Sequence, residues 1–254
     1  MKLSLSNGIF SKRTLDENLA AVSRLGFENL EFNMKCVEKE DEDSVYTAKK
    51  LIDFYGLNCL TVHAASLHVR NEDEIATAVY YGKVSADFAY KLSAPVLVVH
   101  SNVSRRLPEN LRNKFLTKIF EGLNPYAKSL SLKLSLENLS YASSGFGKNV
   151  TELEEILSIV DDGNMGVTLD FCHAEATGQT ISLLEQYKNR LCNIHMSNRA
   201  HKPFSAETPS LNDFLNRLQG YEYSGPLTME LNSRCTIEEI LKTKMILEKI
   251  LNKN

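Results

Sequence analysis

The sequence of 254 residues lacks the features that mark membrane-embedded, exported and disulfide-bonded proteins. It has no uninterrupted apolar run of about 18 residues, the length that a membrane-spanning helix requires. Its first residues, Met1 to Ser6, alternate in polarity and contain no signal-peptide core, so we expect no export. The five cysteines are an odd number, lie far apart and form no Cys-x-x-Cys pair, which is typical of a reduced, cytoplasmic protein.

The sequence also lacks a strong excess of charge and any linker-like segment. With 29 basic and 32 acidic side chains its formal net charge is −3, which gives no general electrostatic attraction to nucleic acid. A local basic groove is still compatible with this balance. The length and the 43% of hydrophobic residues suit one α/β barrel or two smaller domains. Because no Pro-rich or low-complexity segment divides the chain, we expect one domain over residues 1–254.

The chain does contain a regular alternation of strand, loop and helix patterns, repeated eight times at spacings of about 30 residues. Apolar or alternating runs predict strands over residues 2–6, 29–32, 59–63, 95–100, 132–137, 167–169, 191–196 and 226–231. Helices are predicted over residues 15–25, 44–55, 72–92, 109–129, from 151, 183–187, 211–218 and from 236 to near the C-terminus. Three of them begin with capping-box spacing, at Thr14, Thr151 and Thr236. Residues 38–43 and 140–147 are expected to be loops.

This alternation favours an α/β fold with a parallel sheet and right-handed crossovers. Eight units in about 250 residues match the size of a single (β/α)8 TIM barrel. A doubly wound open sheet is the alternative, but it rarely needs eight units. The first strand–helix turn also lacks the Gly-x-Gly-x-x-Gly fingerprint of dinucleotide-binding sheets.

Polar residues stand at the C-terminal ends of most predicted strands, and in a TIM barrel these ends share the mouth where active sites lie. Four carboxylates crowded there would repel one another and take up protons, unless a cation is present. Imidazole nitrogen and carboxylate oxygen are ordinary ligands of Zn, Mn and Co, so we predict one or two divalent ions per chain. The residues concerned are Glu31, His63, His100, Glu137, Asp170, His195 and Glu230.

Each of these residues also has a purely structural interpretation. His100 follows a buried Val-Leu-Val-Val run and, taken alone, suits a hydrogen-bonded core histidine; His63 has the same alternative. Glu31 is followed by Phe32 and Asn33 and could instead cap a helix or pair with a lysine. Glu137 and Glu230 each end an apolar strand, where an unpaired charge would be costly. The convergence of the set, rather than any single residue, therefore carries the prediction.

The motifs resemble those of the xylose isomerase-like TIM barrels, which include sugar phosphate isomerases and epimerases as well as endonuclease IV. The similarity extends over nearly the whole chain and is specific for the superfamily rather than for a substrate. The matching segments are Val62-His63-Ala, Val98-Val-His100, Glu137-Asn138, Gly166 to Ala174 with Asp170 and His173, Asn193-Ile-His195-Met and Thr228-Met-Glu230.

The resemblance implies roles for residues at matching positions. Glu137, Asp170, His195 and Glu230 would be the shared metal ligands, and His63 and His100 would hold an additional ion with Glu137 bridging. His173 would contact substrate in an epimerase or ligate a third metal in an endonuclease.

The segment after His195 departs from the endonuclease pattern, in which an Asp-x-His completes a third zinc site. His201 can supply the histidine, but Arg199 stands where the acid belongs, and a guanidinium repels a cation. Arg199 is suited to holding an anionic or hydroxylated substrate, although it could equally be a surface arginine. Glu31 and His201 complete the set of expected substrate contacts.

We therefore expect a divalent-metal-dependent isomerase or epimerase of a sugar or sugar-like ketose. The ion would stabilise an enediolate, and Glu137 and Glu230 would act as base and acid at the carbon beside the carbonyl. A small carbohydrate would then be the binding partner. The alternative is an endonuclease IV-like zinc phosphodiesterase acting on abasic DNA. A degenerate barrel that only binds ligand would have lost some central ligands, and none is lost. The sequence leaves open whether chains form a homo-oligomer.

Overall fold

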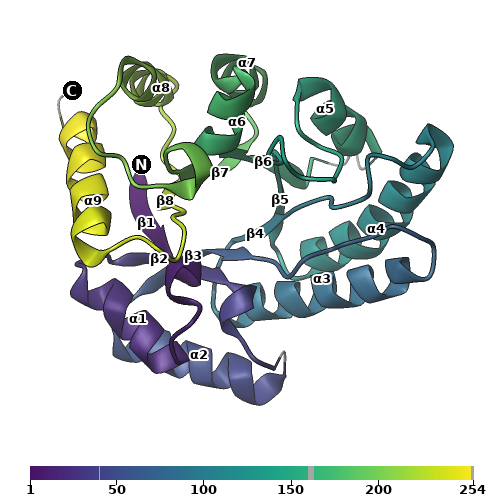
Figure 1. The fold of residues 1–254 in the computed structure, drawn as a ribbon. Helices are drawn as coiled ribbons and strands as arrows, with labels where there is room; N and C mark the ends of the chain where they lie inside the picture. The colour runs from purple at the N-terminus through teal and green to yellow at the C-terminus, as the bar shows by residue number, and fades with distance from the viewer. Residues whose placement is uncertain (40, 160–162, 253–254) are drawn as a thin grey trace.

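The centre of the protein is a closed barrel of eight parallel strands, which neighbour one another in sequence order. The computed structural model describes residues 1–39, 41–159 and 163–252. The helices surround the barrel, as Figure 1 shows. The predicted (β/α)8 TIM barrel is confirmed. Its strands are β1 Lys2–Ser6, β2 Asn29–Asn33, β3 Asn58–His63, β4 Val96–Val99, β5 Lys133–Glu137, β6 Met165–Asp170, β7 Leu191–Met196 and β8 Pro226–Met229.

The helices follow the strands as expected, and two of the three predicted capping boxes are present, at Thr14 and Thr236. Among the helices described, none is long and apolar enough to cross a membrane. They are α1 Leu15–Arg24, α2 Glu42–Phe54, α3 Glu74–Lys91, α4 Glu109–Ser129, α5 Val150–Ile159, α6 Phe171–Thr177, α7 Thr180–Tyr187, α8 Pro209–Gly220 and α9 Ile237–Leu251, with short 3₁₀ helices η1 Asn7–Phe10, η2 Met34–Cys36 and η3 Arg199–His201.

Two helix starts differ from the sequence prediction because another side chain caps the first turn. Helix α2 begins inside the expected loop, since Asp41 accepts a hydrogen bond from the backbone N–H of Ser44 at 2.9 Å. Helix α5 begins at Val150, because Asn149 rather than Thr151 accepts from the third N–H of the helix, at 2.9 Å.

The connection between β6 and β7 holds two helices where one was predicted. Asp170, the last residue of β6, accepts a hydrogen bond from the backbone N–H of His173 at 2.6 Å and so caps α6 directly. Helix α6 ends at Gly178, whose φ of 67° lies in the left-handed region that favours glycine. At the other end of the chain, α9 runs to Leu251, and the predicted continuation over residues 253–254 lies outside the described residues.

The strands alternate between an apolar face, packed against the helices, and a polar face inside the barrel. Glu31 on β2 accepts a hydrogen bond from the side chain of Asn193 on β7 at 3.1 Å, and these strands are not neighbours, so the bond crosses the barrel interior. The polar inner residues are Ser4, Ser6, Glu31, Thr61, Ser135, Thr168, Asn193 and Thr228. The outer residues that join the hydrophobic core include Leu5, Leu30, Phe32, Val62, Leu97, Leu134, Leu136, Leu169, Ile194, Leu227 and Met229.

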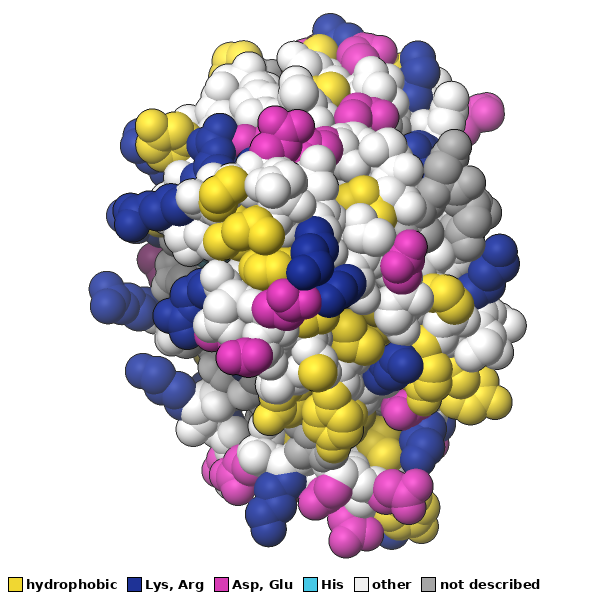
Figure 2. Space-filling view, turned by 90° about the vertical axis from the view of Figure 1, so that its right-hand side faces the viewer, with side chains coloured by type: hydrophobic (Ala, Val, Ile, Leu, Met, Phe, Trp, Pro, Cys, Tyr) yellow, Lys and Arg dark blue, Asp and Glu magenta, His cyan; other side chains and the backbone are white. Residues whose placement is uncertain are grey.

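The outer surface of the helical layer differs from the barrel mouth in the residues that it carries. Figure 2 faces the side of α3, α4 and α5, where hydrophobic side chains are interspersed with basic and acidic ones and no histidine is visible. Five of the six histidines of the chain are instead gathered at the C-terminal ends of the strands. That end of the barrel therefore carries the residues that could take part in catalysis or metal binding.

Candidate metal centre

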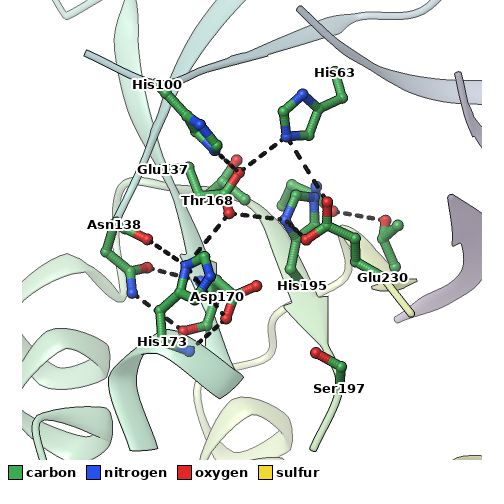
Figure 3. Close-up of polar contacts among 12 residues, drawn as sticks. His63, His100, Glu137, Asn138, Thr168, Asp170, His173, His195, Ser197 and Glu230 are labelled. Carbon is green, nitrogen blue, oxygen red and sulfur yellow. Dashed lines mark hydrogen bonds and ion pairs between the residues drawn. The ribbon is translucent and has the colours of Figure 1, made fainter. Parts of the chain in front are cut away.

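The barrel brings the predicted metal-ligating residues together. His63, Glu137 and Asp170 are the last residues of β3, β5 and β6, and His100 and Glu230 directly follow β4 and β8. Their ligating atoms form three overlapping groups, in each of which the atoms lie within 4.8 Å of one another. Figure 3 shows the side chains converging on Glu137. The groups are Glu137, Asp170, His195 and Glu230; His63, His100 and Glu137; and Asp170, His173 and His201.

The first group, called here the central set, has the geometry of a single-ion site. The Nδ1 atom of His195 lies 3.3 Å from Glu137 Oε1 and 3.3 Å from Glu230 Oε2. Ligands about 2.1 Å from one ion lie within roughly 4.2 Å of each other, so these spacings suit a shared cation. Asp170 and His195 are fully buried and only Glu230 is partly open, with 17% of its side chain exposed. Access to the central set is therefore over Glu230.

Two atoms of the central set lack a hydrogen-bond partner within the described part of the chain. Asp170 Oδ2 and His195 Nδ1 are buried and accept or donate no hydrogen bond there. A buried polar atom left without a partner costs about 1–3 kcal/mol. His195 Nδ1 faces Glu137 and Glu230, Asp170 belongs to the same group, and a carboxylate oxygen and an imidazole nitrogen are suitable metal ligands. The residues present therefore fit a divalent cation.

The pKa shifts show how strongly the buried charges depend on one another. Burial raises the pKa of Asp170, and the nearby Glu137 adds to this, while His173 opposes it. Burial by itself would raise the pKa of Glu137, but protonated His195 and His100 lower this pKa well below the usual range. Burial by itself would lower the pKa of His195, but the carboxylates of Glu31, Glu137 and Glu230 outweigh burial and raise this pKa. In the metal-free protein, protons on histidine thus balance the carboxylates, and a bound cation would replace them.

Glu31 lies beneath the central set and orients His195. Its Oε2 atom accepts a hydrogen bond from His195 Nε2 at 2.9 Å, which leaves Nδ1 free to face Glu137 and Glu230. A carboxylate that holds the second nitrogen of a ligating histidine fixes its tautomer and ring orientation. The side chains of Thr61 and Asn193 donate to the same oxygen at 2.9 and 3.1 Å.

This position corrects the expectation that Glu31 contacts substrate. Its side chain has no exposed surface, and it lies one layer deeper than the ligands. Glu31 is followed two residues later by Asn33, and its inward direction follows from the alternation of β2. The sequence did contain the signal, since a glutamate in the middle of an apolar strand needs an interior partner.

The second group places two histidines on the same carboxylate. His100 Nε2 lies 2.9 Å from Glu137 Oε2, and His63 Nε2 lies 3.4 Å from that oxygen and 3.9 Å from Glu230 Oε1. Burial lowers the pKa of His63, but the carboxylates of Glu137, Glu230 and Glu31 outweigh it and raise the pKa to about 9. A bridging Glu137 between this group and the central set is the arrangement that the sequence predicted for a second ion.

The third group contains a close pair of histidines. His173 Nδ1 lies 2.8 Å from the carbonyl of Asn138, and His201 Nδ1 lies 3.2 Å from the carbonyl of Glu230. Because a carbonyl only accepts, each Nδ1 carries a proton. The two Nε2 atoms face each other at 3.1 Å, so their lone pairs repel unless a proton or a cation lies between them. The sequence placed both residues at the site as substrate contacts, and the structure brings them together there.

Arg199 differs from the other predicted site residues. It is exposed on η3, and its backbone N–H donates to the side chain of Asn198 at 2.7 Å. Among the described residues, its guanidinium makes no ion pair or hydrogen bond with any of the three groups. The structure therefore does not join Arg199 to the site, and its role as a substrate contact stays a prediction.

A cavity of about 470 Å³ opens above the potential metal-binding groups and is lined by His63, His100 and Glu230. Its other polar wall residues were not singled out from the sequence: they are Asn33, Lys35, Ser66 and Asn102. A hollow of about 600 Å³, lined in part by Lys2, Glu28 and Asn58, lies elsewhere, beside the N-terminal ends of the first strands. Within the described chain, none of the potential metal-binding groups borders that hollow.

The family of the chain is established by comparison with known proteins. The sequence model of the xylose isomerase-like TIM barrels matches residues 19–249, so the chain belongs to that family. An uncharacterized protein of Methanocaldococcus jannaschii is 22% identical over 99% of this chain and 89% of its own length. A probable endonuclease 4 of Aquifex aeolicus is 30% identical, over 61% of this chain and 55% of the relative.

Solved structures share the fold at low sequence identity. A D-tagatose 3-epimerase-like protein superimposes with a TM-score of 0.84 at 22% identity, covering 99% of this chain and 97% of its own. An IolI protein with a bound zinc atom has a TM-score of 0.81 at 18% identity, covering 100% and 99%. At this identity the similarity establishes the shared barrel, and chemistry must be argued from the site.

Proposed function

We propose that the protein is a divalent-metal-dependent isomerase or epimerase of a sugar or sugar-like ketose. The observation that carries the proposal is the central set, in which two glutamates, one aspartate and one histidine converge beneath an open cavity. Two structural neighbours support it, because one is named as D-tagatose 3-epimerase-like and the other holds zinc. The central set is complete, which does not favour a barrel that has lost its catalytic function.

Glu137 and Glu230 are the residues that would move protons. Both have lowered pKa values, because His195, with His100 in the case of Glu137, outweighs the upward effect of burial, so both are carboxylates at neutral pH, the form that a base requires. Both lie 3.3 Å from His195 Nδ1, which brings two carboxylates to one reacting region. One would take a proton from the carbon beside the carbonyl, and the other, after taking up a proton from solvent, would return a proton to that carbon or its neighbour. A bound divalent ion would supply Lewis acidity toward two adjacent substrate oxygens.

The remaining residues would bind and orient the sugar. His173 and His201 lie beside Asp170 at the edge of the central set and offer imidazole nitrogens to hydroxyl groups. Glu230 lines the cavity, so substrate would approach from its side. Arg199, which is exposed on η3, would be a further contact from outside the three groups.

An endonuclease IV-like phosphodiesterase acting on abasic DNA is the second candidate, and one observation favours it. His173 and His201 meet at Asp170 as a third potential metal group, and a partial sequence match to a probable endonuclease 4 accompanies this. A cluster of zinc ions would supply an activated water and a stabilised leaving oxygen. Against this candidate, the exposed cation Arg199 stands two residues before His201, where a carboxylate ligand was expected.

Solvent exchange tests the first candidate directly. The metal-loaded protein would be incubated with a panel of ketoses in deuterated water, and deuterium at the carbon beside the carbonyl would be scored by mass spectrometry. Exchange with at least one ketose, lost after chelation and restored by added metal, is the expected result. An absence of exchange across ketoses, tested with Zn, Mn and Co in turn, would overturn the proposal.

Metal content and nuclease activity separate the two candidates. Elemental analysis of the purified protein should find one or two transition-metal ions per chain, and an abasic duplex should stay intact. Three tightly held zinc ions together with incision of that duplex would replace the isomerase by the endonuclease. A matched duplex without an abasic site controls for contaminating nucleases.

A further inference from the structure

Two hydrogen-bond donors lie side by side on the wall of the mouth cavity, above Gly8. A Cβ atom placed on Gly8 would be 2.8 Å from Lys35 Nζ and 3.1 Å from Asn33 Nδ2. Both Asn33 and Lys35 line the cavity that contains His63 and Glu230. The glycine therefore leaves room for the lysine side chain to cross it toward the mouth.

Asn33 is held with its donor group available. Its side-chain oxygen accepts a hydrogen bond from the backbone N–H of Lys35 at 3.1 Å, and its own backbone N–H donates to Asn7 Oδ1 at 2.8 Å. The bond to the side-chain oxygen fixes the orientation of the amide, and it leaves the NH2 group free to donate. The residue as a whole is buried, with a relative exposure of 5%, and it lines the cavity, where its NH2 group donates no hydrogen bond to any of the described residues.

The side chain of Lys35 is exposed, and its ammonium group also lacks a protein partner among the described residues. Across residues 1–39, 41–159 and 163–252, no carboxylate forms an ion pair with its ammonium group. Among the residues lining the cavity, Lys35 and Glu230 are the ones with permanently charged side chains, and Glu230 belongs to the metal-binding central set. The wall thus presents one positive charge and an adjacent amide donor, and no side chain or backbone group in the described part of the chain accepts a hydrogen bond from either.

We propose that Asn33 and Lys35 form a subsite for an anionic group of the substrate, a phosphate monoester or a carboxylate carried by the ketose. The inference rests on the proposed function and adds the substrate class to it. An anionic oxygen accepts hydrogen bonds from both donors, and the bond from the ammonium is charge-assisted. The sugar would place its reacting carbons at the central set and its anionic group toward η2.

The test compares three ketoses that differ only in the group at C6, which is neutral in D-fructose and anionic in D-fructose 6-phosphate and D-fructuronate. Solvent exchange with the metal-loaded protein gives KM and kcat for each. For the preferred anionic ketose, Lys35→Met should raise KM by about 10- to 100-fold, with a much smaller change in kcat, because a charge-assisted hydrogen bond is lost from binding. Lys35→Arg should restore most of the affinity. Lys12→Met, a surface lysine outside this cavity, is the matched control and should leave every KM unchanged.

Gly8→Ala provides a variant that retains the charge but displaces it. The added methyl would lie 2.6 Å from Lys35 Cε, so the lysine side chain must move. It should raise KM for the anionic ketose by part of the Lys35→Met effect, about 3- to 10-fold, with an unchanged circular dichroism spectrum. A KM like that of the wild type would contradict the placement of the ammonium over Gly8.

Calorimetric binding distinguishes failure of this subsite from failure of the proposed function. Fructose 6-phosphate and fructuronate would be titrated into metal-loaded wild-type protein and Lys35→Met, with fructose as the neutral probe. Tighter binding of one anionic probe that is lost in Lys35→Met supports the subsite even if no exchange occurs, and its identity separates phosphate from carboxylate. Equal binding of all three probes, or equal binding by the two proteins, would overturn the subsite whether or not exchange is observed.

Discussion

The inner and outer faces of the barrel strands carry opposite kinds of side chain. On the outer face, buried residues such as Leu97, Leu136 and Leu227 pack against the helices in one continuous hydrophobic core. On the inner face, hydroxyl, amide and carboxylate groups predominate, although the interior of a TIM barrel is usually filled by branched apolar side chains. The outer face therefore accounts for the stability of the fold, and the inner face is available to support chemistry at the mouth.

The polar interior forms a second layer directly beneath the ligands. In five strands a polar residue stands two positions before a ligand and points to the same side. The interior bonds connect these layers, since Thr228 donates to Asn193 at 2.9 Å and Asn193 donates to Glu31, which holds His195. The ligands are thus supported by hydrogen bonds rather than by apolar packing. The pairs are Thr61 and His63, Ser135 and Glu137, Thr168 and Asp170, Asn193 and His195, and Thr228 and Glu230.

The largest effect is expected from Glu230→Gln at the mouth end of β8. The amide cannot act as a base, so solvent exchange should fall by at least about 10²- to 10⁴-fold while the melting temperature stays close to that of the wild type. Glu222→Gln, an exposed glutamate before the start of the same strand, should leave both quantities unchanged. Turnover at the wild-type rate by Glu230→Gln would remove that residue from the mechanism.

Leu227→Ala, three residues earlier on the same strand, is expected to lower stability and leave activity unchanged. Leu227 is fully buried in the outer core, and truncation should lower the free energy of unfolding by about 2–5 kcal/mol through lost contacts and a cavity. Urea denaturation measures this, and metal content and exchange rate should be unchanged at low temperature. A folded Leu227→Ala protein with a tenfold slower exchange would show that the two faces are not separable.

An intermediate effect is expected from Glu31→Gln in the layer beneath the ligands. Loss of the negative charge weakens the orientation of His195, and metal affinity should fall by about 10- to 100-fold, as measured by competition with a chelator. Glu28→Gln, an exposed glutamate just before β2, is the control and should bind metal normally. If Glu31→Gln retained full affinity, the bond to His195 would have no part in metal binding.

The ends of the strands could be predicted from the sequence because local patterns determine them. Apolar runs ending in Glu137 or Asp170 identify both a buried strand and a charged residue that must find a partner. The family follows from the same segments, and its model matches the chain. What depends on the closure of the barrel could not be predicted in this way. Glu31 and Asn193 are 162 residues apart and meet only because β2 and β7 face each other across the interior.

The other differences between the prediction and the structure each have a local cause. Asp170 was predicted as a ligand, and it also caps α6, which the sequence pattern did not reveal because the strand and the helix share that residue. Lys35 was overlooked because nothing in its sequence context shows that it crosses Gly8. Arg199 was expected to hold substrate on the basis of its position two residues before His201, but direction on an exposed loop cannot be derived from spacing.

A smaller effect is expected from pH in the metal-free protein. The folded-state pKa of His63 is about 9, above its usual value of 6.5, so its ion pairs stabilise the fold fully below about pH 6.5 and are lost as the pH rises through 9. The free energy of unfolding should therefore fall by on the order of 1–3 kcal/mol between pH 6.5 and 9.5. His63→Gln should reduce this dependence, and exposed His68→Gln should retain it in full. Added metal should also flatten it, because the cation replaces the proton.

The smallest effect is expected from substitutions of two paired residues inside the barrel. Their comparison is also the most direct test of the inner face. Ser4 on β1 lies opposite Thr228 on β8, and both are fully buried. Thr228 donates to Asn193, whereas the hydroxyl of Ser4 has no partner in the described structure. Thr228→Val should therefore cost about 1–3 kcal/mol, since it leaves Asn193 Oδ1 unsatisfied, and Ser4→Ala should be neutral or slightly stabilising. Equal destabilisation by both substitutions, measured by urea denaturation, would mean that the interior is hydrated and that its hydroxyls are supported by water rather than by one another.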